Sequence, residues 1–157
     1  MKETADKFRD LVENAAQSLL KLSTTEAAGK PAPDKWSPKE IIGHLIDSAC
    51  NNHSRFVRAQ LQDHMVFDGY DQVAWVQLQG YQALGWHATV TLWAAYNMHL
   101  AAVIERIDDS VAHRKISRHN LHEIAWKTVP QNEPATLAYF VEDYIAHMHH
   151  HLKQILD

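Results

Sequence analysis

The fold is decided by the segment at residues 143–155, DYIAHMHHHLKQI. At about 100° per residue, the apolar residues in and before this segment fall on one stripe: Leu137, Val141, Tyr144, Met148, Leu152 and Ile155. Such a stripe is typical of the buried face of an amphipathic helix. The histidines between these positions are therefore predicted to be residues of a core-forming helix and not an appended tag.

The helical spacing separates these histidines by direction. Residues four apart share a face of a helix, so His147 and His151 lie together at the border of the apolar stripe. His150 lies beside His147, and His149 falls on the opposite face. Two neutral imidazoles at positions i and i+4 can bind one metal ion. A third ligand would have to come from elsewhere in the chain.

Three further long helices are expected before this one. The apolar spacing predicts helices over about residues 1–22, 38–62 and 86–107, and a last helix over about 134–157. The second has a strong start signal, because Ser37 is an N-cap, Pro38 suits the first position and Glu40 completes a capping box. Residues 23–26 can start a further turn, and Pro134 is expected at the first position of the last helix.

The remaining segments are predicted to be connections. Residues 63–85 are too long for a tight hairpin and are interpreted as a crossover with one short helix. Residues 111–131 are expected to be mostly loop, with a turn of helix near 121–126. No segment has a strand pattern. We therefore predict an all-α four-helix bundle, formed by one domain over residues 1–157, with a long crossover between its second and third helices.

Composition restricts the function classes. The net charge of −4, the pI near 6.3 and the lack of long basic runs predict no nucleic-acid partner and no membrane surface. Cys50 is the one cysteine, which excludes an intrachain disulfide, and no secretion signal or twenty-residue apolar run is found. We therefore expect a cytoplasmic protein. The tryptophan content permits a homodimer interface, although no residue requires one.

Eight histidines outside the last helix are candidates for the third metal ligand: His44, His53, His64, His87, His99, His113, His119 and His122. His44 shares its helix face with Asp47, Asn51 and Arg55. A carboxylate or amide near a metal-bound imidazole commonly orients the second ring nitrogen. However, a helix face of this composition is usually the solvent face, so the pattern alone leaves both interpretations open.

Several runs of the chain resemble the DinB-like superfamily, and most closely its YfiT group of metal-dependent hydrolases, which includes bacillithiol S-transferases. These runs are WSPKEIIGHLIDS at 36–48, Arg55-Phe56, Tyr70-Asp71 with Trp75, and residues 144–155. The resemblance implies a bundle with an up-down-down-up course and a divalent metal ion on His44, His147 and His151. In the similar thiol-dependent maleylpyruvate isomerases a glutamate replaces the first histidine of the last-helix pair, so His147 indicates the three-histidine branch.

The resemblance is incomplete in two places. Gln154 stands where the YfiT group often has a histidine, and residues 111–131 have no convincing match. The run containing Tyr70, Asp71 and Trp75 is expected either to line the substrate pocket or to fix the crossover loop. The tryptophans are otherwise expected in the core or in subunit contacts.

Three imidazoles leave a divalent metal, expected to be zinc or nickel, with an open position typical of a catalytic site. The first hypothesis is activation of a low-molecular-weight thiol for transfer to an electrophilic small molecule. Arg55 is the first candidate for holding a carboxylate of the thiol, and Arg58 is the second. The second is hydrolysis by activated water, with His150 or Asp47 relaying protons. The third is a non-enzymatic stress-response or binding module. Arg55 can alternatively form an ion pair with Asp47 or Asp143.

Overall fold

The structure is a computed structural model that describes all of residues 1–157. It contains no strand, and its helices are α1 (Lys2–Leu19), α2 (Thr24–Ala28), α3 (Pro38–Leu61), α4 (Gln72–Gln79), the 3-10 turn η1 (Tyr81–Ala83), α5 (Trp86–Glu105), α6 (Asp109–Ala112), α7 (Leu121–Ile124) and α8 (Leu137–Leu156). None of these helices is both long and apolar enough to cross a bilayer.

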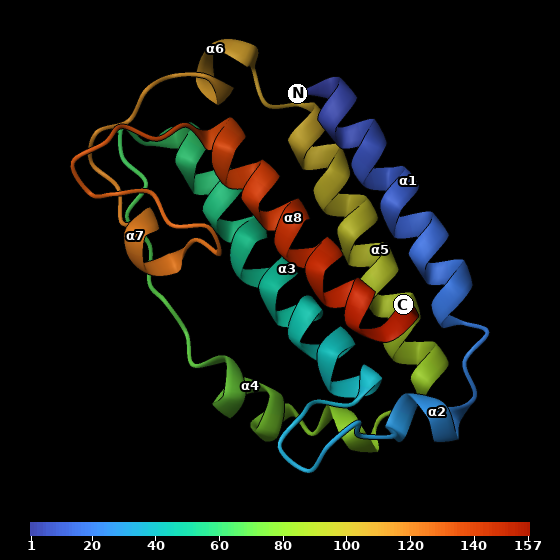
Figure 1. Ribbon diagram of the computed structural model, residues 1–157. Coiled ribbons are helices and arrows are strands. Elements are labelled where there is room, and N and C mark those ends of the chain that lie inside the picture. The colour runs from blue at the N-terminus through green and yellow to red at the C-terminus, as the bar shows by residue number, and fades with distance from the viewer.

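The four long helices α1, α3, α5 and α8 form a bundle with an up-down-down-up course (Figure 1). Helix α5 packs against α1 and α3, and α8 packs against the same two helices from the other side. Helices α3 and α5 run in the same direction because residues 62–85 return the chain along the length of the bundle (Figure 1). The predicted all-α bundle with a long crossover after its second helix is therefore confirmed.

Local sequence signals set two helix starts. At α3 the Ser37 hydroxyl accepts a hydrogen bond from the Glu40 N–H at 3.3 Å, and the Glu40 carboxylate accepts one from the Ser37 N–H at 2.8 Å. Ser23 and Glu26 form a second capping box at the start of α2. Each box satisfies backbone N–H groups that the first turn of a helix leaves without partners.

The predicted start of the last helix was wrong by three residues. Helix α8 begins at Leu137, and the Thr136 side chain accepts the N-cap hydrogen bond from the Tyr139 N–H. Pro134 lies before the helix because the next residue, Ala135, exchanges both backbone hydrogen bonds with Ile116 at 2.8 and 3.0 Å. This bridge keeps residue 135 extended, so the helix can begin only after it. The other long helices end within a few residues of their predicted limits.

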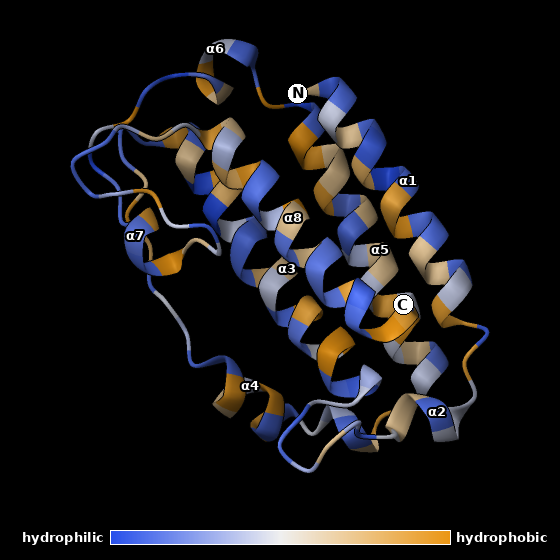
Figure 2. Ribbon diagram, viewed as in Figure 1, coloured by the Kyte–Doolittle hydropathy of each residue, from blue (hydrophilic) through white to orange (hydrophobic).

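The apolar stripe of α8 faces the core as predicted. Leu137, Val141, Tyr144, Met148 and Leu152 are buried, and the Tyr144 hydroxyl donates a hydrogen bond to Asn97 of α5. Helices α3 and α8 show alternating hydrophobic and hydrophilic segments along their length (Figure 2), which is the pattern of amphipathic helices. His147 and His151, which lie at the edge of this stripe, consequently face α3.

The end of the crossover packs tightly on α3 at Gly43. A Cβ atom at this glycine would lie 2.1 Å from the Tyr81 ring, which is itself buried. Gly43→Ala should therefore lower the free energy of unfolding by about 1–2 kcal/mol, because overpacking outweighs the gain of about 1 kcal/mol in helix propensity. Urea unfolding monitored by circular dichroism measures the change.

Gly29→Ala is the matched control for this prediction. The nearest atom to a Cβ at Gly29 is 3.4 Å away, and the backbone φ of −66° suits any residue. We expect this variant to unfold within about 0.5 kcal/mol of the wild type. A Gly43→Ala protein as stable as the Gly29→Ala protein would contradict the proposed close packing.

Candidate metal centre

Three histidines from two helices meet inside the bundle. His44 lies on α3, and His147 and His151 lie one turn apart on α8. One ring nitrogen from each residue lies within 4.8 Å of the other two, and the His44 and His147 Nε2 atoms are 3.3 Å apart. The i, i+4 pair predicted from the sequence thus meets its third member across the interface between α3 and α8.

The three imidazoles are neutral near pH 7. Burial, assisted by the neighbouring His147 and His151, lowers the pKa of His44 from 6.5 to about 3. Burial also lowers the pKa of His147 to about 4, and it lowers that of His151. A neutral imidazole keeps a lone pair for a metal ion, whereas an imidazolium cannot act as a ligand.

One nitrogen pair of the cluster already has the spacing of two ligands on a tetrahedral metal ion. Two nitrogens that are each about 2.0–2.1 Å from one tetrahedral zinc ion lie about 3.3 Å apart, and the His44 and His147 Nε2 atoms are separated by 3.3 Å. The donor set of three imidazoles leaves a fourth position for another ligand. The cluster is therefore suited to a divalent transition metal such as zinc or nickel.

The polar face of α3 is buried, which excludes the solvent-face interpretation of His44. His44 is 0% exposed, Asp47 is 3% exposed, and the Trp36 ring lies 5.1 Å from the His44 ring. The Asp47 carboxylate accepts hydrogen bonds from Gln79 at 2.6 Å and from the Tyr81 hydroxyl at 2.7 Å. Asp47 therefore anchors the crossover and does not hydrogen-bond to His44, whose Nδ1 is buried without a partner.

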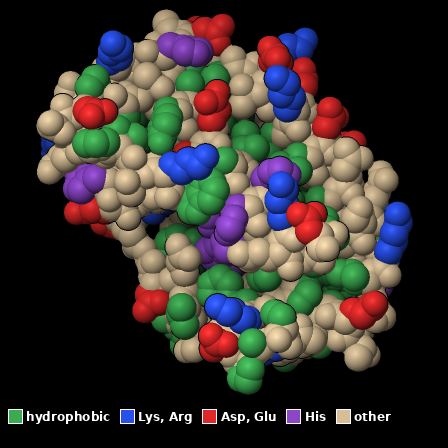
Figure 3. Space-filling view, viewed as in Figure 1, with side chains coloured by type: hydrophobic (Ala, Val, Ile, Leu, Met, Phe, Trp, Pro, Cys, Tyr) green, Lys and Arg blue, Asp and Glu red, His purple; other side chains and the backbone are tan.

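A small cavity of about 310 Å³ opens beside the cluster. His147, His150 and His151 form its α8 side, and Arg55 and Tyr70 line it from α3 and the crossover. The space-filling view shows histidine side chains beside a hollow near the centre of this face (Figure 3). The remaining lining residues are Ser48, Asn52, Gln72, Glu123, Ile124, Ala125, Trp126, Phe140, Asp143 and Tyr144.

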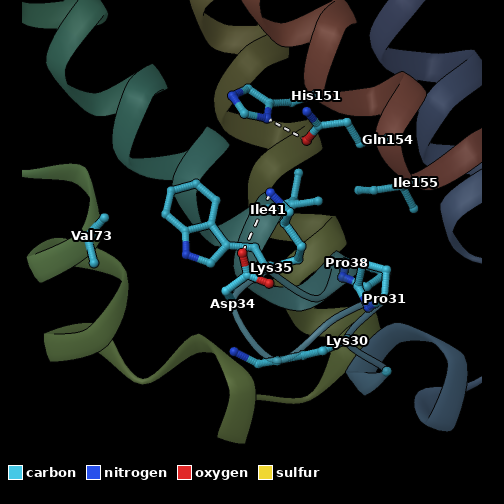
Figure 4. A pocket seen from close by; sticks show the side chains of 12 residues that line it. Lys30, Pro31, Asp34, Lys35, Pro38, Ile41, Val73, His151, Gln154 and Ile155 are labelled. Carbon is cyan, nitrogen blue, oxygen red and sulfur yellow. Dashed lines mark hydrogen bonds and ion pairs between the residues drawn. The ribbon is translucent and has the colours of Figure 1, made fainter.

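A wider cavity of about 950 Å³ lies on the other side of His151. The close view places His151 and Gln154 of α8 at one edge and Val73 of α4 at another (Figure 4). The Oε1 atom of Gln154 accepts a hydrogen bond from His151 Nδ1 at 3.0 Å. His151 lines both cavities, so the cluster lies between two spaces that can each hold a small molecule.

Several residues singled out in the sequence lie outside both cavities. The Asn51 side chain donates to the Asp47 backbone oxygen, and Asp71 is the N-cap of α4. Trp75 packs against Tyr70 with ring centroids 4.9 Å apart. Asp71 and Trp75 thus fix the crossover, whereas Tyr70, from the same run, lines the small cavity.

Both predicted ion pairs of Arg55 are absent. Its Nη2 donates to the Asp68 backbone oxygen at 2.7 Å, whereas Asp47 accepts from Gln79 and Tyr81. Asp143 accepts hydrogen bonds from the backbone N–H groups of Trp126 and Lys127 at 2.9 and 2.7 Å. Asp47 thus accepts hydrogen bonds from the crossover, and Asp143 accepts them from the segment before α8, so neither carboxylate is paired with Arg55.

Trp126 is the main site residue that the sequence interpretation missed. Its ring lies 5.2 Å from His150 and 6.2 Å from His147, and 42% of the residue is exposed. The expectation of a core role is therefore wrong for this tryptophan, which lines the small cavity, and a role in a subunit contact stays a prediction. A possible sequence signal was Asp143 on the buried half of α8, since a buried carboxylate requires hydrogen-bond donors.

Comparisons with known proteins agree with this architecture. The family model described as the DinB superfamily matches residues 2–155. The Bacillus subtilis (strain 168) protein named "Putative metal-dependent hydrolase YfiT" is 22% identical over 160 residues, which cover 99% of this chain and 84% of the relative. The solved structure of Bacillus subtilis YfiT, described as having an unusual four-helix bundle topology, superposes with a TM-score of 0.76 at 20% identity, covering 99% of this chain and 85% of that one.

Proposed function

The chain belongs to the DinB superfamily, and we propose that it is a metal-dependent enzyme that transfers a low-molecular-weight thiol to an electrophilic small molecule. The observation that carries the proposal is the position of the neutral histidine cluster between two cavities. A transfer reaction needs space for two substrates beside one reactive centre. Hydrolysis needs space for only one substrate and a water molecule.

His44, His147 and His151 would hold the ion, and their ring nitrogens already lie within 4.8 Å of one another. When bound, a divalent metal lowers the pKa of a thiol or water at its open position and so supplies a nucleophile near neutral pH. The aromatic residues around the histidine cluster shape the space in which a substrate would be held. The fully buried His44 packs against the half-buried Trp36 ring on one side, and the Trp126 ring lies beside His147 and His150 on the other.

The nucleophile must lose a proton, and a leaving group must gain one. Both transfers require a side chain in the cavity that can accept and donate a proton. His150 lines the small cavity and hydrogen-bonds with Gln154 at 3.2 Å, which orients its ring. Asp47, the other candidate, lines neither cavity and already accepts two hydrogen bonds. We therefore assign the proton-transfer role to His150.

The second candidate function is metal-dependent hydrolysis, as the name of the relative YfiT states for that protein. The same three histidines and His150 would serve this reaction, with water in place of the thiol. The wide cavity, which is lined by Lys30 and Lys35 as well as His151, would then hold the substrate alone.

The two functions are tested with zinc-loaded and nickel-loaded protein. Turnover of 1-chloro-2,4-dinitrobenzene or monobromobimane is measured with cysteine, glutathione and bacillithiol as the thiol, beside a set of ester, amide and phosphoester substrates. We expect metal-dependent conjugation that is lost in His44→Ala. Turnover of the hydrolytic substrates alone would contradict the transferase and support the hydrolase. No turnover of either kind would favour a binding or stress-response module.

A further inference from the structure

A buried guanidinium that forms no ion pair lines the small cavity. Arg55 is 6% exposed, and no carboxylate forms an ion pair with it. Of its five N–H groups, one donates to a protein acceptor, the Asp68 backbone oxygen at 2.7 Å. Taking an unpaired charge out of water is costly. An anion in the cavity would complete the hydrogen bonding of this side chain.

The acidic residues of the cavity do not supply this anion. Asp143 is held by two backbone N–H groups at 2.9 and 2.7 Å and forms no ion pair with Arg55. Glu123 accepts a hydrogen bond from Asn120, and its side chain is 63% exposed. The charge of Arg55 is therefore available to a ligand.

The side-chain oxygen of Asn52, on the same helix, also lacks a hydrogen-bond partner and indicates which group of the ligand lies next to its anionic group. Asn52, which is 7% exposed and lines the same cavity, donates through Nδ2 to the Ser48 backbone oxygen at 2.9 Å. Its Oδ1 is buried and has no hydrogen-bond donor. A buried amide oxygen needs a donor, so the ligand should present an N–H or O–H group close to its anionic group.

We propose that Arg55 and Asn52 form a subsite for a carboxylate with an adjacent N–H group, the arrangement found in amino acids and in N-acyl amino acids. The inference rests on the proposed function in that this subsite would hold the carboxylate of the thiol substrate beside the histidine cluster. Arg55 suits this role because its planar fork binds a carboxylate through two parallel hydrogen bonds. A volume of about 310 Å³ restricts the ligand to a small molecule.

The test measures binding and not turnover. N-acetyl-S-methylcysteine, whose thioether replaces the thiol, is titrated into the full chain with and without zinc, and ¹H–¹⁵N shifts of the Trp126 indole and the Arg55 side chain are followed by NMR. The methyl ester of the same compound is the neutral probe. We expect saturable shifts with the acid and at least about tenfold weaker binding of the ester, since a charge-assisted pair is lost.

Variants locate the subsite. Arg55→Gln should weaken binding of the acid about tenfold or more, and Asn52→Leu should weaken it severalfold. Arg58→Gln is the matched control, because Arg58, the other arginine considered for this carboxylate, is exposed on the same helix and lines neither cavity. Circular dichroism checks that each variant is folded. The comparison of acid with ester on the wild type needs no variant and remains decisive if Arg55→Gln does not fold.

Equal binding of acid and ester, or an Arg55→Gln protein that binds the acid as well as Arg58→Gln does, would overturn the subsite. These results are separate from those on the proposed function. Carboxylate binding without any turnover would support the proposed subsite and contradict the proposed transferase function. Turnover that is as fast with esterified thiols as with the free acids would support the transferase function and contradict the proposed subsite.

Discussion

His44→Ala, His147→Ala and His151→Ala should each reduce the bound metal from about one ion per chain to less than a tenth of that amount. Each substitution removes one of three nitrogens that lie within 4.8 Å of one another, and the two that remain bind an ion much more weakly. Elemental analysis of untagged protein, purified without metal resin and then dialysed against a weak chelator, measures the effect.

His149→Ala is the matched control, because His149 lies on the same helix but on its exposed face. This variant should keep its metal. A second measurement separates metal loss from misfolding: added zinc should raise the melting temperature of the wild type and of His149→Ala, since a ligand that binds only the folded state stabilises it. The three site variants should show little zinc-dependent shift. Full metal content in any one of them would remove that residue from the site.

The fold was predictable because its main signals are local. The Ser37 and Glu40 capping box and the apolar stripe of α8 lie within single helices, and both are found as expected. The start of α8 was not predictable in this way. It depends on the hydrogen bonds of Ala135 with Ile116, a partner 19 residues earlier that no helical pattern reveals.

The candidate site was predictable only in part. Spacing on α8 pairs His147 with His151, but it does not select His44 from the eight histidines outside the last helix. The resemblance to a family made that selection, whereas the residue pattern equally suited a solvent-facing helix. The burial of His44 depends on the crossover, which covers this face of α3 through the hydrogen bonds of Gln79 and Tyr81 to Asp47. Such tertiary coverage is not encoded in the periodicity of α3.

The cavity wall opposite α3 was the least predictable part. Trp126 reaches His150 because the segment before α8 is fixed to the crossover at several points. Met65 exchanges backbone hydrogen bonds with Arg118 and Asn120 at 2.9 and 3.1 Å, and the Asn120 side chain bonds both the N–H and the oxygen of Phe67. Two irregular segments thus hold each other in place. Neither has a periodic pattern from which the contact could be inferred.

The metal-free protein should lose much of its stability between pH 7 and pH 4. The pKa of His44 is lowered by burial to about 3 in the folded state, against 6.5 for the free side chain. Between these values the unfolded chain binds a proton that the folded chain does not, so the free energy of unfolding falls as the pH falls. At about 1.4 kcal/mol per pH unit, His44 alone would remove on the order of 3 kcal/mol between pH 7 and pH 4.

This loss is large beside the roughly 5–15 kcal/mol that stabilises a typical domain. His147, with a pKa lowered to about 4, should add to it over the same interval. Urea unfolding of chelator-treated protein at half-unit steps of pH measures the slope. The stabilising contribution of the neutral cluster is complete above about pH 6.5 and disappears as each folded-state pKa is approached from above.

His44→Gln isolates the contribution of one histidine, because glutamine has a similar size and binds no proton. The variant should be less sensitive to acid than the wild type, with its stability curve flatter between pH 6.5 and pH 4. His149→Gln, which removes an exposed histidine from α8, should follow the wild-type curve. Parallel curves for the wild type and His44→Gln would mean that His44 gains a proton in the folded state as readily as in the unfolded chain. That result would contradict the description of the three histidines as buried, neutral metal ligands.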